Sequence, residues 1–271
     1  MAGQPKLMSS HTHIPRKRFG QHFLHDQHVI AKIIQAIAPT PEEHLVEIGP
    51  GQGALTTAIL PLVKTLDVVE LDRDLIPYLQ AVCEDLGDLK VHQADALKFD
   101  FSGLATDGRL LRIIGNLPYN ISTPLIFHLL DSITQIKDMH FMLQKEVAER
   151  MVAAPGSEHY GRLSVMVQYH CQIKLLFDVG PHSFTPPPKV ISSFLRMLPV
   201  IRPVKAHNLV RLQDIVRQSF SHRRKMLHNC LKGLVSVAEL ESIGIVPDIR
   251  PEQLAVEDFV RISNIVDDGT V

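Results

Sequence analysis

The amino-acid sequence predicts an α/β protein with a doubly wound, mostly parallel sheet, followed by a small C-terminal domain made only of helices. Short apolar runs alternate with helical patterns between residues 26 and 143. Glycine, acidic or asparagine residues stand where several of these apolar runs end, and the last part of the chain shows helical patterns with no strands between them. Strands that alternate with helices at this spacing are typical of a doubly wound sheet.

The N-terminal part of the chain supplies the strands of the expected parallel sheet. Asp26 is a suitable N-cap for a helix over Asp26–Ala38, whose apolar residues fall on one stripe and which two prolines end. Predicted strands and helices then follow in the order strand Leu45–Ile48, helix Ala54–Val63, strand Thr65–Leu71, helix Leu75–Leu86, strand Leu89–Gln93, strand Leu110–Ile114, helix Ser122–Ile133 and strand His140–Leu143.

The ends of these strands predict a ligand-binding cleft. Right-handed crossovers place the carboxyl ends of parallel strands at one edge of a sheet. Gly49, Glu70, Asp95 and Asn116 each fall at the end of a successive predicted strand. We therefore expect these four residues to lie close together.

The pattern changes in the second half of the chain. The segments Leu163–Tyr169, Ile173–Val179 and Ile191–Leu198 predict two or three further elements, antiparallel strands with a helix before them, and a linker lies between Pro199 and Pro203. Beyond the linker, the sequence predicts helices over Asn208–Phe220, Lys225–Leu231, Val237–Ile243 and Val256–Val266. We expect two domains, residues 1–203 with the sheet and residues 204–271 with helices only.

Composition narrows the class of protein. The 271 residues are 45% hydrophobic and 21% charged, as in a soluble globular protein. No apolar run is as long as a membrane span, and Met1–His13 lacks the apolar segment of a signal peptide, so we expect a cytoplasmic protein without membrane contact. The three cysteines lie far apart, which argues against a zinc site and a disulfide framework.

Positive charge is concentrated at two places although the net charge is only −1. A chain with balanced charge can still present a basic face to a nucleic acid if its cations cluster. Two solvated surface runs are the simpler alternative. The two clusters are Arg16, Lys17 and Arg18 near the N-terminus, and Arg223, Arg224 and Lys225 in the predicted helical domain.

The stretch Gly115–Asn120 places polar and planar groups at the expected cleft. The side-chain oxygen of Asn116 can accept a hydrogen bond from the exocyclic amine of an adenine, and Pro118 keeps the turn stiff because its φ is fixed. Tyr119 can stack on a base that has left its stack. An ordinary strand-to-helix turn is the alternative for this stretch taken alone.

The loop Glu47–Gly53 fits two classes of cofactor. Glycines after the first strand allow a close approach of the backbone to a ligand, and an acid at the end of the next strand can bind a ribose diol. The dinucleotide fingerprint would need its third glycine one residue later, and Pro50 is an insertion relative to it. The loop instead resembles the first motif of S-adenosylmethionine-dependent methyltransferases.

Five motifs together resemble the ribosomal RNA adenine dimethyltransferase family. They are Lys17–Leu24, the Glu47–Gly51 loop, Glu70–Asp72, Gly115–Asn120 and Phe184–Val190. Leu143–Val147 and Tyr160–Val165 are similar to the bacterial small-subunit branch, the kasugamycin-sensitivity enzymes. The resemblance covers nearly the whole chain. It implies a Rossmann-like methyltransferase sheet and transfer of two methyl groups to N6 of each of two adjacent adenosines, in the hairpin loop near the 3′ end of small-subunit RNA.

The resemblance also implies roles for single residues. S-adenosylmethionine would contact His22, Leu24, Gly49, Gly51, Glu70, Asp95 and Asn116. The target adenine would be held at Asn116, Leu117, Pro118 and Tyr119, with Phe184 stacked on its other face. Position 22 is more often asparagine in this family, and for Phe184 the alternative is a core aromatic residue.

Methyl transfer of this kind needs neither a metal nor a covalent intermediate, because the sulfonium carries its own leaving group and the protein must only align the reacting atoms. The partner implied is small-subunit RNA, within a partly assembled subunit, and the protein is expected to be a monomer. A nicotinamide-dependent oxidoreductase would leave Asn116 and Tyr119 without a role. A non-catalytic ribosome-assembly factor would not need an intact cleft, and the large-subunit methylases of antibiotic resistance remain open within the family.

Overall fold

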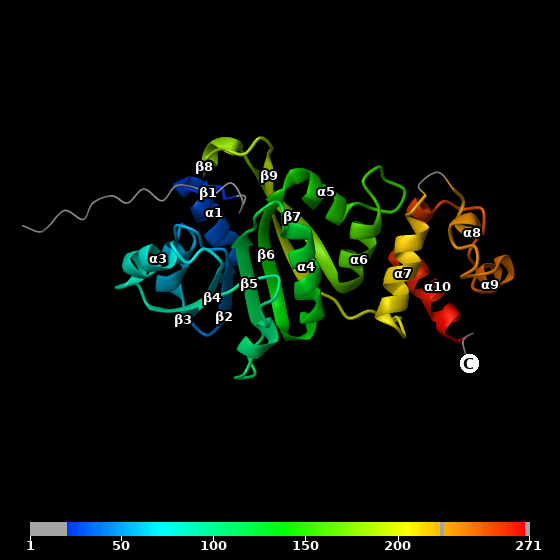
Figure 1. Ribbon diagram of the computed structural model, residues 1–271, viewed down its shortest axis with the longest axis horizontal. Coiled ribbons are helices and arrows are strands. Elements are labelled where there is room, and N and C mark those ends of the chain that lie inside the picture. Colours follow the sequence, from blue (N-terminus) through cyan, green and yellow to red (C-terminus); the bar gives the residue numbers. More distant parts are fainter. Residues whose placement is uncertain (1–20, 223–224, 269–271) are drawn as a thin grey trace, which may run out of the picture.

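The computed structural model describes residues 21–222 and 225–268, and Figure 1 shows their arrangement. Seven strands form a mixed sheet in the order β4-β3-β2-β5-β6-β9-β7. The first five strands in this order are parallel, whereas β9 pairs antiparallel with both β6 and β7. The strands are β2 (His44–Ile48), β3 (Thr65–Glu70), β4 (Asp88–Gln93), β5 (Leu111–Asn116), β6 (Ile136–Gln144), β7 (Cys171–Val179) and β9 (Ser192–Pro199).

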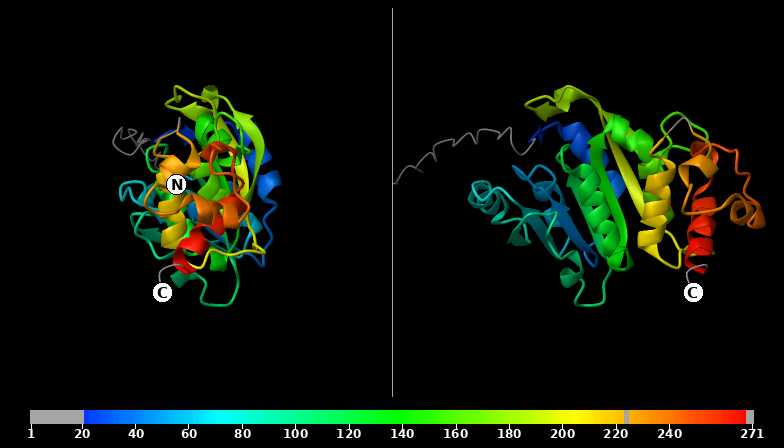
Figure 2. Two further views of the ribbon diagram at one scale, coloured as in Figure 1. Left: turned by 90° about the vertical axis from the view of Figure 1, so that its right-hand side faces the viewer. Right: turned by 45° about the vertical axis from the view of Figure 1, so that its right-hand side comes forward.

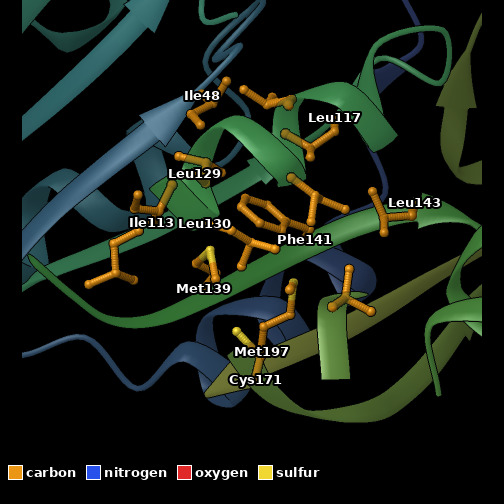
Figure 3. Packing of buried hydrophobic residues seen from close by; sticks show 14 of the residues in the cluster. Ile48, Ile113, Leu117, Leu129, Leu130, Met139, Phe141, Leu143, Cys171 and Met197 are labelled. Atoms are coloured by element: carbon orange, nitrogen blue, oxygen red, sulfur yellow. The ribbon is translucent and has the colours of Figure 1, made fainter. Parts of the chain in front are cut away.

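The central strands are buried on both faces, as parallel strands covered by helices usually are. Nearly every residue of β2, β3 and β5 is buried. Ile113 and Phe141 belong to one hydrophobic cluster, part of which is drawn in Figure 3. Their chain neighbours Ile114 and Met142 belong to a second cluster, because successive side chains of a strand point to opposite faces.

Helices from the first part of the chain cover the two faces of the sheet. The cluster with Ile114 includes residues of α1 (Gln27–Ile37), α2 (Thr56–Ile59) and α3 (Ile76–Cys83). The cluster with Ile113 includes residues of α4 (Ser122–Asp131), α5 (Lys145–Val152) and α6 (Arg162–His170). The predicted cap of the first helix is confirmed, since the Asp26 side chain accepts from the N–H groups of His28 and Val29.

Some elements differ from the sequence prediction. The helix expected over Ala54–Val63 is shorter, and a 3₁₀ turn at Leu60–Leu62 follows α2. Pro61 cannot donate a backbone hydrogen bond, which accounts for the break. Strand β6 is longer than predicted, and no predicted helix had the bounds of α5, which follows it. Residues Leu163–Tyr169 lie in the helix α6 and not in a strand. A separate pair of short strands, β1 (Phe23–Leu24) and β8 (Phe184–Thr185), was also not predicted.

A buried ionic network holds the C-terminal end of α1 against the sheet. Arg112 on β5 is 5% exposed and donates to both carboxylate oxygens of Asp138, to the Ile37 carbonyl oxygen and to Glu43. The Ile37 carbonyl is one of the last of α1 and has no partner within the helix. His140 lies beside the network, and burial lowers its pKa to about 4, so the ring is neutral at pH 7. The guanidinium therefore stabilises both the helix end and the Asp138 carboxylate.

The C-terminal part is helical, and the predicted fold class is confirmed. Figures 1 and 2 show its helices together at the end of the molecule away from β3 and β4. Their core continues into the preceding part of the chain, since Tyr160 and Met166 share a hydrophobic cluster with Leu212 and Phe259. The division at residue 203 thus stays a prediction. The helices are α7 (Leu209–Ser219), α8 (Leu227–Cys230), α9 (Val237–Ser242) and α10 (Val256–Asp268).

Within residues 21–222 and 225–268, no helix combines the length and the apolar character that a membrane crossing requires.

Gly115 on β5 leaves no room for a side chain beside β2, which leads to a prediction. A Cβ atom at this position would lie 2.6 Å from the carbonyl oxygen of Ile48, which is fixed in the neighbouring strand. We expect Gly115→Ala to lower the free energy of unfolding by about 1–3 kcal/mol, the usual cost of overpacking. Urea unfolding of the purified variant measures this loss.

Gly161→Ala is the matched control. A Cβ atom there would meet no heavy atom within 4 Å, and the backbone of Gly161 is extended with φ −173°. Its free energy of unfolding should fall by less than that of Gly115→Ala, since the change only replaces the glycine N-cap of α6 by alanine, a loss of under about 1 kcal/mol. Equal stability of both variants would mean that β5 can move away from Ile48 without cost.

Candidate active site

A cleft of about 270 Å³ opens at the carboxyl ends of β2, β3 and β5 and beside the turn after β4. The positions predicted from the strand ends meet there: Gly49 follows β2, Glu70 ends β3, Asp95 follows β4 and Asn116 ends β5. Residues 21–24, which precede α1, also line the cleft. The cleft therefore lies between the sheet edge and the start of the described chain.

The glycine loop after β2 is held by hydrogen bonds from its backbone N–H groups to β3, one to a carbonyl oxygen and one to a carboxylate. The Gly49 N–H donates to the Val69 carbonyl oxygen at 2.9 Å, and the Gly51 N–H donates to Glu70 Oε2 at 3.2 Å. Gly51 has a φ of 56°, and a Cβ atom there would lie 3.0 Å from the ring of Phe23. Glycine thus satisfies both the left-handed backbone and the close passage of the segment before α1.

Glu70 presents a buried and oriented carboxylate. The side chain is 6% exposed, and its Oε1 accepts from the Asp72 N–H at 2.7 Å. Burial raises the pKa of this carboxyl group, whereas the two backbone N–H donors oppose the rise. Each carboxylate oxygen keeps a further lone pair, so the group can still accept two hydrogen bonds from a diol.

Asp95 lies at the cleft wall farther along the sheet edge. It is half-buried, and its Oδ1 accepts from the Leu97 N–H at 3.0 Å, which orients the carboxyl group. An acid in this place can accept a hydrogen bond from an amine on a planar ring.

The Asn116 side chain is oriented by the segment that covers the cleft. Its Nδ2 donates to the His22 carbonyl oxygen at 2.9 Å. Because an amide nitrogen can only donate, this contact distinguishes Nδ2 from Oδ1. The Oδ1 atom is therefore the acceptor that is available to a ligand.

Tyr119 and His22 form an aromatic pair beside Asn116. Their ring centroids are 5.5 Å apart with an interplanar angle of 29°. His22 Nδ1 lies 2.7 Å from the Pro186 carbonyl oxygen, and because a carbonyl only accepts, this nitrogen carries the proton. The Tyr119 hydroxyl bonds to the Ser192 hydroxyl at 2.7 Å.

The structure brings most of the predicted site residues together. The following predicted residues line the cleft: His22, Leu24, Gly49, Gly51, Glu70, Asp95, Asn116, Leu117, Pro118 and Tyr119. Leu117 is 1% exposed and packs in a hydrophobic cluster. Their assignment to a cofactor or to a target base stays a prediction.

Phe184 does not line the cleft. The ring is 2% exposed and lies in the same hydrophobic cluster as Leu24, its partner in the pairing of β1 with β8. This is the position that the core-packing alternative expects. A stacking role would require the Phe184 ring to leave the core. The stacking role therefore stays a prediction, and the geometry does not support it.

The predicted basic clusters fall mostly outside the described chain. Arg16, Lys17, Arg18, Arg223 and Arg224 lie outside the described residues. Lys225 is described and exposed, but the prediction that it starts a helix is wrong, because α8 begins at Leu227.

Sequence reasoning missed two polar residues near the cleft. Glu47 lines the cleft at 2% exposure, and its Oε2 accepts from the Thr56 hydroxyl at 2.6 Å. Ser192 is fully buried behind Tyr119. The sequence could have indicated Glu47, because it is a charged residue inside an otherwise apolar strand. No local pattern indicates that Ser192 contacts Tyr119.

The chain is similar to known proteins over nearly its whole length. Residues 12–268 match the family model described as "Ribosomal RNA adenine dimethylase". Two relatives called "Ribosomal RNA small subunit methyltransferase A" are each 53% identical to this chain. The match to the protein of Marinomonas sp. (strain MWYL1) covers 96% of this chain and 98% of the relative. The match to the protein of Pseudomonas syringae pv. syringae (strain B728a) covers 98% of this chain and 99% of the relative.

Solved structures support the same fold. A dimethyladenosine transferase from Plasmodium falciparum superposes with a TM-score of 0.78 at 29% identity, covering 89% of this chain and 96% of that one. A 23S rRNA methyltransferase superposes with a TM-score of 0.70 at 22% identity, covering 90% and 99%, and shows the shared fold.

The buried carboxyl group of Glu47 leads to a pH-dependent prediction. Its pKa is raised from 4.5 to about 7, chiefly by burial, while the hydrogen bond from the Thr56 hydroxyl opposes the rise and the nearby Glu70 adds to it. As the pH rises above 4.5, Glu47 ionises in the unfolded chain but not in the folded protein, so the free energy of unfolding falls. This loss of stability is complete above pH 7, where Glu47 ionises in the folded protein as well. A shift of this size corresponds to about 3 kcal/mol.

Glu47→Gln keeps an oxygen for the Thr56 hydroxyl and removes the ionisation. We expect the variant to be more stable than the parent by up to about 3 kcal/mol at pH 8 and equally stable at pH 4. Urea unfolding at both pH values measures the difference, with the exposed Glu84→Gln as a control that should change little. A Glu47→Gln variant without a pH-dependent gain would show that Glu47 ionises freely in the folded protein.

Proposed function

Because the chain belongs to the ribosomal RNA adenine dimethylase family, we propose that it transfers methyl groups from S-adenosylmethionine to small-subunit ribosomal RNA. The targets are the N6 atoms of two adjacent adenosines in the 3′-terminal hairpin loop, and the product is N6,N6-dimethyladenosine. The observation that carries the proposal is the orientation of the Asn116 amide. Its oxygen is available to a ligand, and Asn116 and Glu70 line the same cleft. The protein thus acts in biogenesis of the small subunit.

The cleft fits the methyl donor. A ribose diol needs acceptors, and the Glu70 carboxylate is held in place by two backbone N–H groups. Asp95 lies one strand farther and can accept from the adenine amine of the donor. The Gly49–Gly51 backbone leaves room for the ligand beside it. When bound, S-adenosylmethionine supplies a methyl group on a positively charged sulfur.

Asn116 addresses the main chemical difficulty of the reaction. The N6 amine of adenine is a weak nucleophile because its lone pair is shared with the ring. Acceptance of an N–H bond by Asn116 Oδ1 favours a more tetrahedral nitrogen, and Pro118 limits movement of the turn that carries the residue. Tyr119 offers its ring to the base, which must leave its stack.

The residues of the cleft need not remove a proton before transfer, because the amine becomes acidic only when it has been methylated. Positioning by Asn116 and Tyr119 is then the main contribution of the protein. A nicotinamide-dependent oxidoreductase would leave both residues unused. A non-catalytic assembly factor would have no need for the oriented Glu70 carboxylate.

Binding of the RNA itself is assigned to basic residues at both ends of the chain. We assign phosphate contacts to Arg16, Lys17, Arg18, Arg223, Arg224 and Lys225, because local contacts must supply the attraction when the net charge is −1. In this proposal residues 204–271 face the RNA, and a cytoplasmic monomer acts on a partly assembled small subunit.

Labelled S-adenosylmethionine and undermethylated small ribosomal subunits test the proposed function. We expect labelled N6,N6-dimethyladenosine after nucleoside analysis, and no label in large subunits treated in parallel. Asn116→Ala should lower the initial rate by at least about a hundredfold, in the range of other lost transition-state contacts. Label in another nucleoside, or in large subunits only, would contradict the assignment.

The role of Glu70 gives a separate prediction for the cofactor. Glu70→Ala should weaken binding of S-adenosylmethionine by about 1.5–3 kcal/mol, the range for hydrogen bonds to a charged group. Calorimetry measures the affinity, and a thermal melt checks that the Asp72 and Gly51 N–H groups tolerate the loss of their acceptor. Exposed Glu84→Ala is the control and should bind normally. Unchanged affinity in folded Glu70→Ala would remove this residue from the cofactor site.

A further inference from the structure

The hydroxyl group of Tyr119 has one defined partner in the structure, and that partner is remote in sequence. The Tyr119 and Ser192 oxygens are 2.7 Å apart, and either can be the donor. Tyr119 is half-buried in the turn after β5, where its ring borders the cleft. On one side the ring meets His22, with centroids 5.5 Å apart.

Ser192 is a rigid anchor for this contact. It is fully buried and is the first residue of β9. Its backbone is paired with Gln144 of β6 on one side and with Val179 of β7 on the other, so the sheet fixes its position from two sides. The Tyr119 side chain, by contrast, projects from a turn between β5 and α4.

We propose that Ser192 is a positioning residue for methyl transfer, which acts through the hydroxyl of Tyr119 by fixing the direction of the long axis of the ring that receives the target base. This inference rests on the proposed function. The Tyr119 hydroxyl oxygen lies on the long axis of the ring, so its hydrogen bond to Ser192 restrains the direction of that axis. The contact with the His22 ring acts on the rotation of the ring about the same axis, which is otherwise broad.

The expected consequence is a slower transfer step with unchanged cofactor binding. Without the hydroxyl pair the ring samples other positions, and a smaller fraction of bound bases has the geometry for attack. Ser192→Ala should lower kcat about three- to tenfold, the size of one ordinary hydrogen bond. The affinity for S-adenosylmethionine should not change, because the Ser192 side chain does not line the cleft.

A double-mutant cycle separates positioning from general stability. The variants are Ser192→Ala, Tyr119→Phe and the two combined, assayed with undermethylated small subunits at saturating substrate. If Ser192 acts only through the Tyr119 hydroxyl, both single changes lower kcat by the same factor and the double variant is no slower than either. Multiplying effects would overturn the proposal, as would a Ser192→Ala variant with the parent kcat.

Ser193→Ala is the matched control. Ser193 is the next residue of the same strand, is also fully buried, and donates to Asp178 Oδ1 at 2.6 Å rather than to the cleft. It should change the melting temperature about as much as Ser192→Ala does but leave kcat as it was. An equal loss of kcat in Ser193→Ala would show that β9 acts only through stability.

The same assay distinguishes failure of this inference from failure of the proposed function. A parent protein that forms no N6,N6-dimethyladenosine would reject the function itself. A parent protein that forms it, with a cycle in which the two changes multiply, would reject only the link between Ser192 and Tyr119.

Discussion

The hydrogen bond from Asn116 Nδ2 to the His22 carbonyl oxygen is the contact on which the cleft depends. It joins the end of β5 to the segment before α1, residues that are 94 positions apart. The bond closes the cavity between the sheet edge and residues 21–24 and, at the same time, leaves Asn116 Oδ1 as the acceptor for a ligand. If this segment moved away, the amide would lose its orientation and Tyr119 its contact with the His22 ring. Closure and chemistry are therefore set by one interaction.

The segment that includes His22 is held by contacts at both ends of α1. Before the helix, the Ser183 hydroxyl donates to the Asp26 carboxylate that caps it, and β1 pairs with β8. At the other end, the buried Arg112 guanidinium binds the Ile37 carbonyl oxygen and Asp138. Buried ion pairs gain little net stability because desolvation opposes them. The benefit here is geometric, because the pair fixes α1 to β5 and β6, and thus fixes the residues that precede α1 over the cleft.

The sequence was sufficient for the sheet and the wall of the cleft because both follow local rules. An apolar run followed by glycine, an acid or asparagine predicts a strand end, and parallel strand ends converge. Contacts between distant segments had no such signal. Phe184 lies in the core because its strand pairs with that of Leu24, 160 positions earlier in the numbering. The Ser192 hydroxyl is bonded to Tyr119, which also lies in a distant part of the sequence. Helix α5 was missed because eight residues are too few for a strong periodic pattern, and such a helix owes its stability to tertiary packing.

The charge of the cleft separates the two classes of cofactor that the glycine loop alone left open. Among the described residues that line it, Glu47, Glu70 and Asp95 carry carboxyl groups, of which Glu47 with its pKa of about 7 is only partly ionised at pH 7, and none is lysine or arginine. A dinucleotide would bring a pyrophosphate toward these carboxylates, and the Gly51 N–H that such a phosphate would need already donates to Glu70. A sulfonium has the opposite charge and is attracted by the same groups. The carboxylates of the cleft thus oppose the oxidoreductase alternative by electrostatics, independently of the roles of Asn116 and Tyr119.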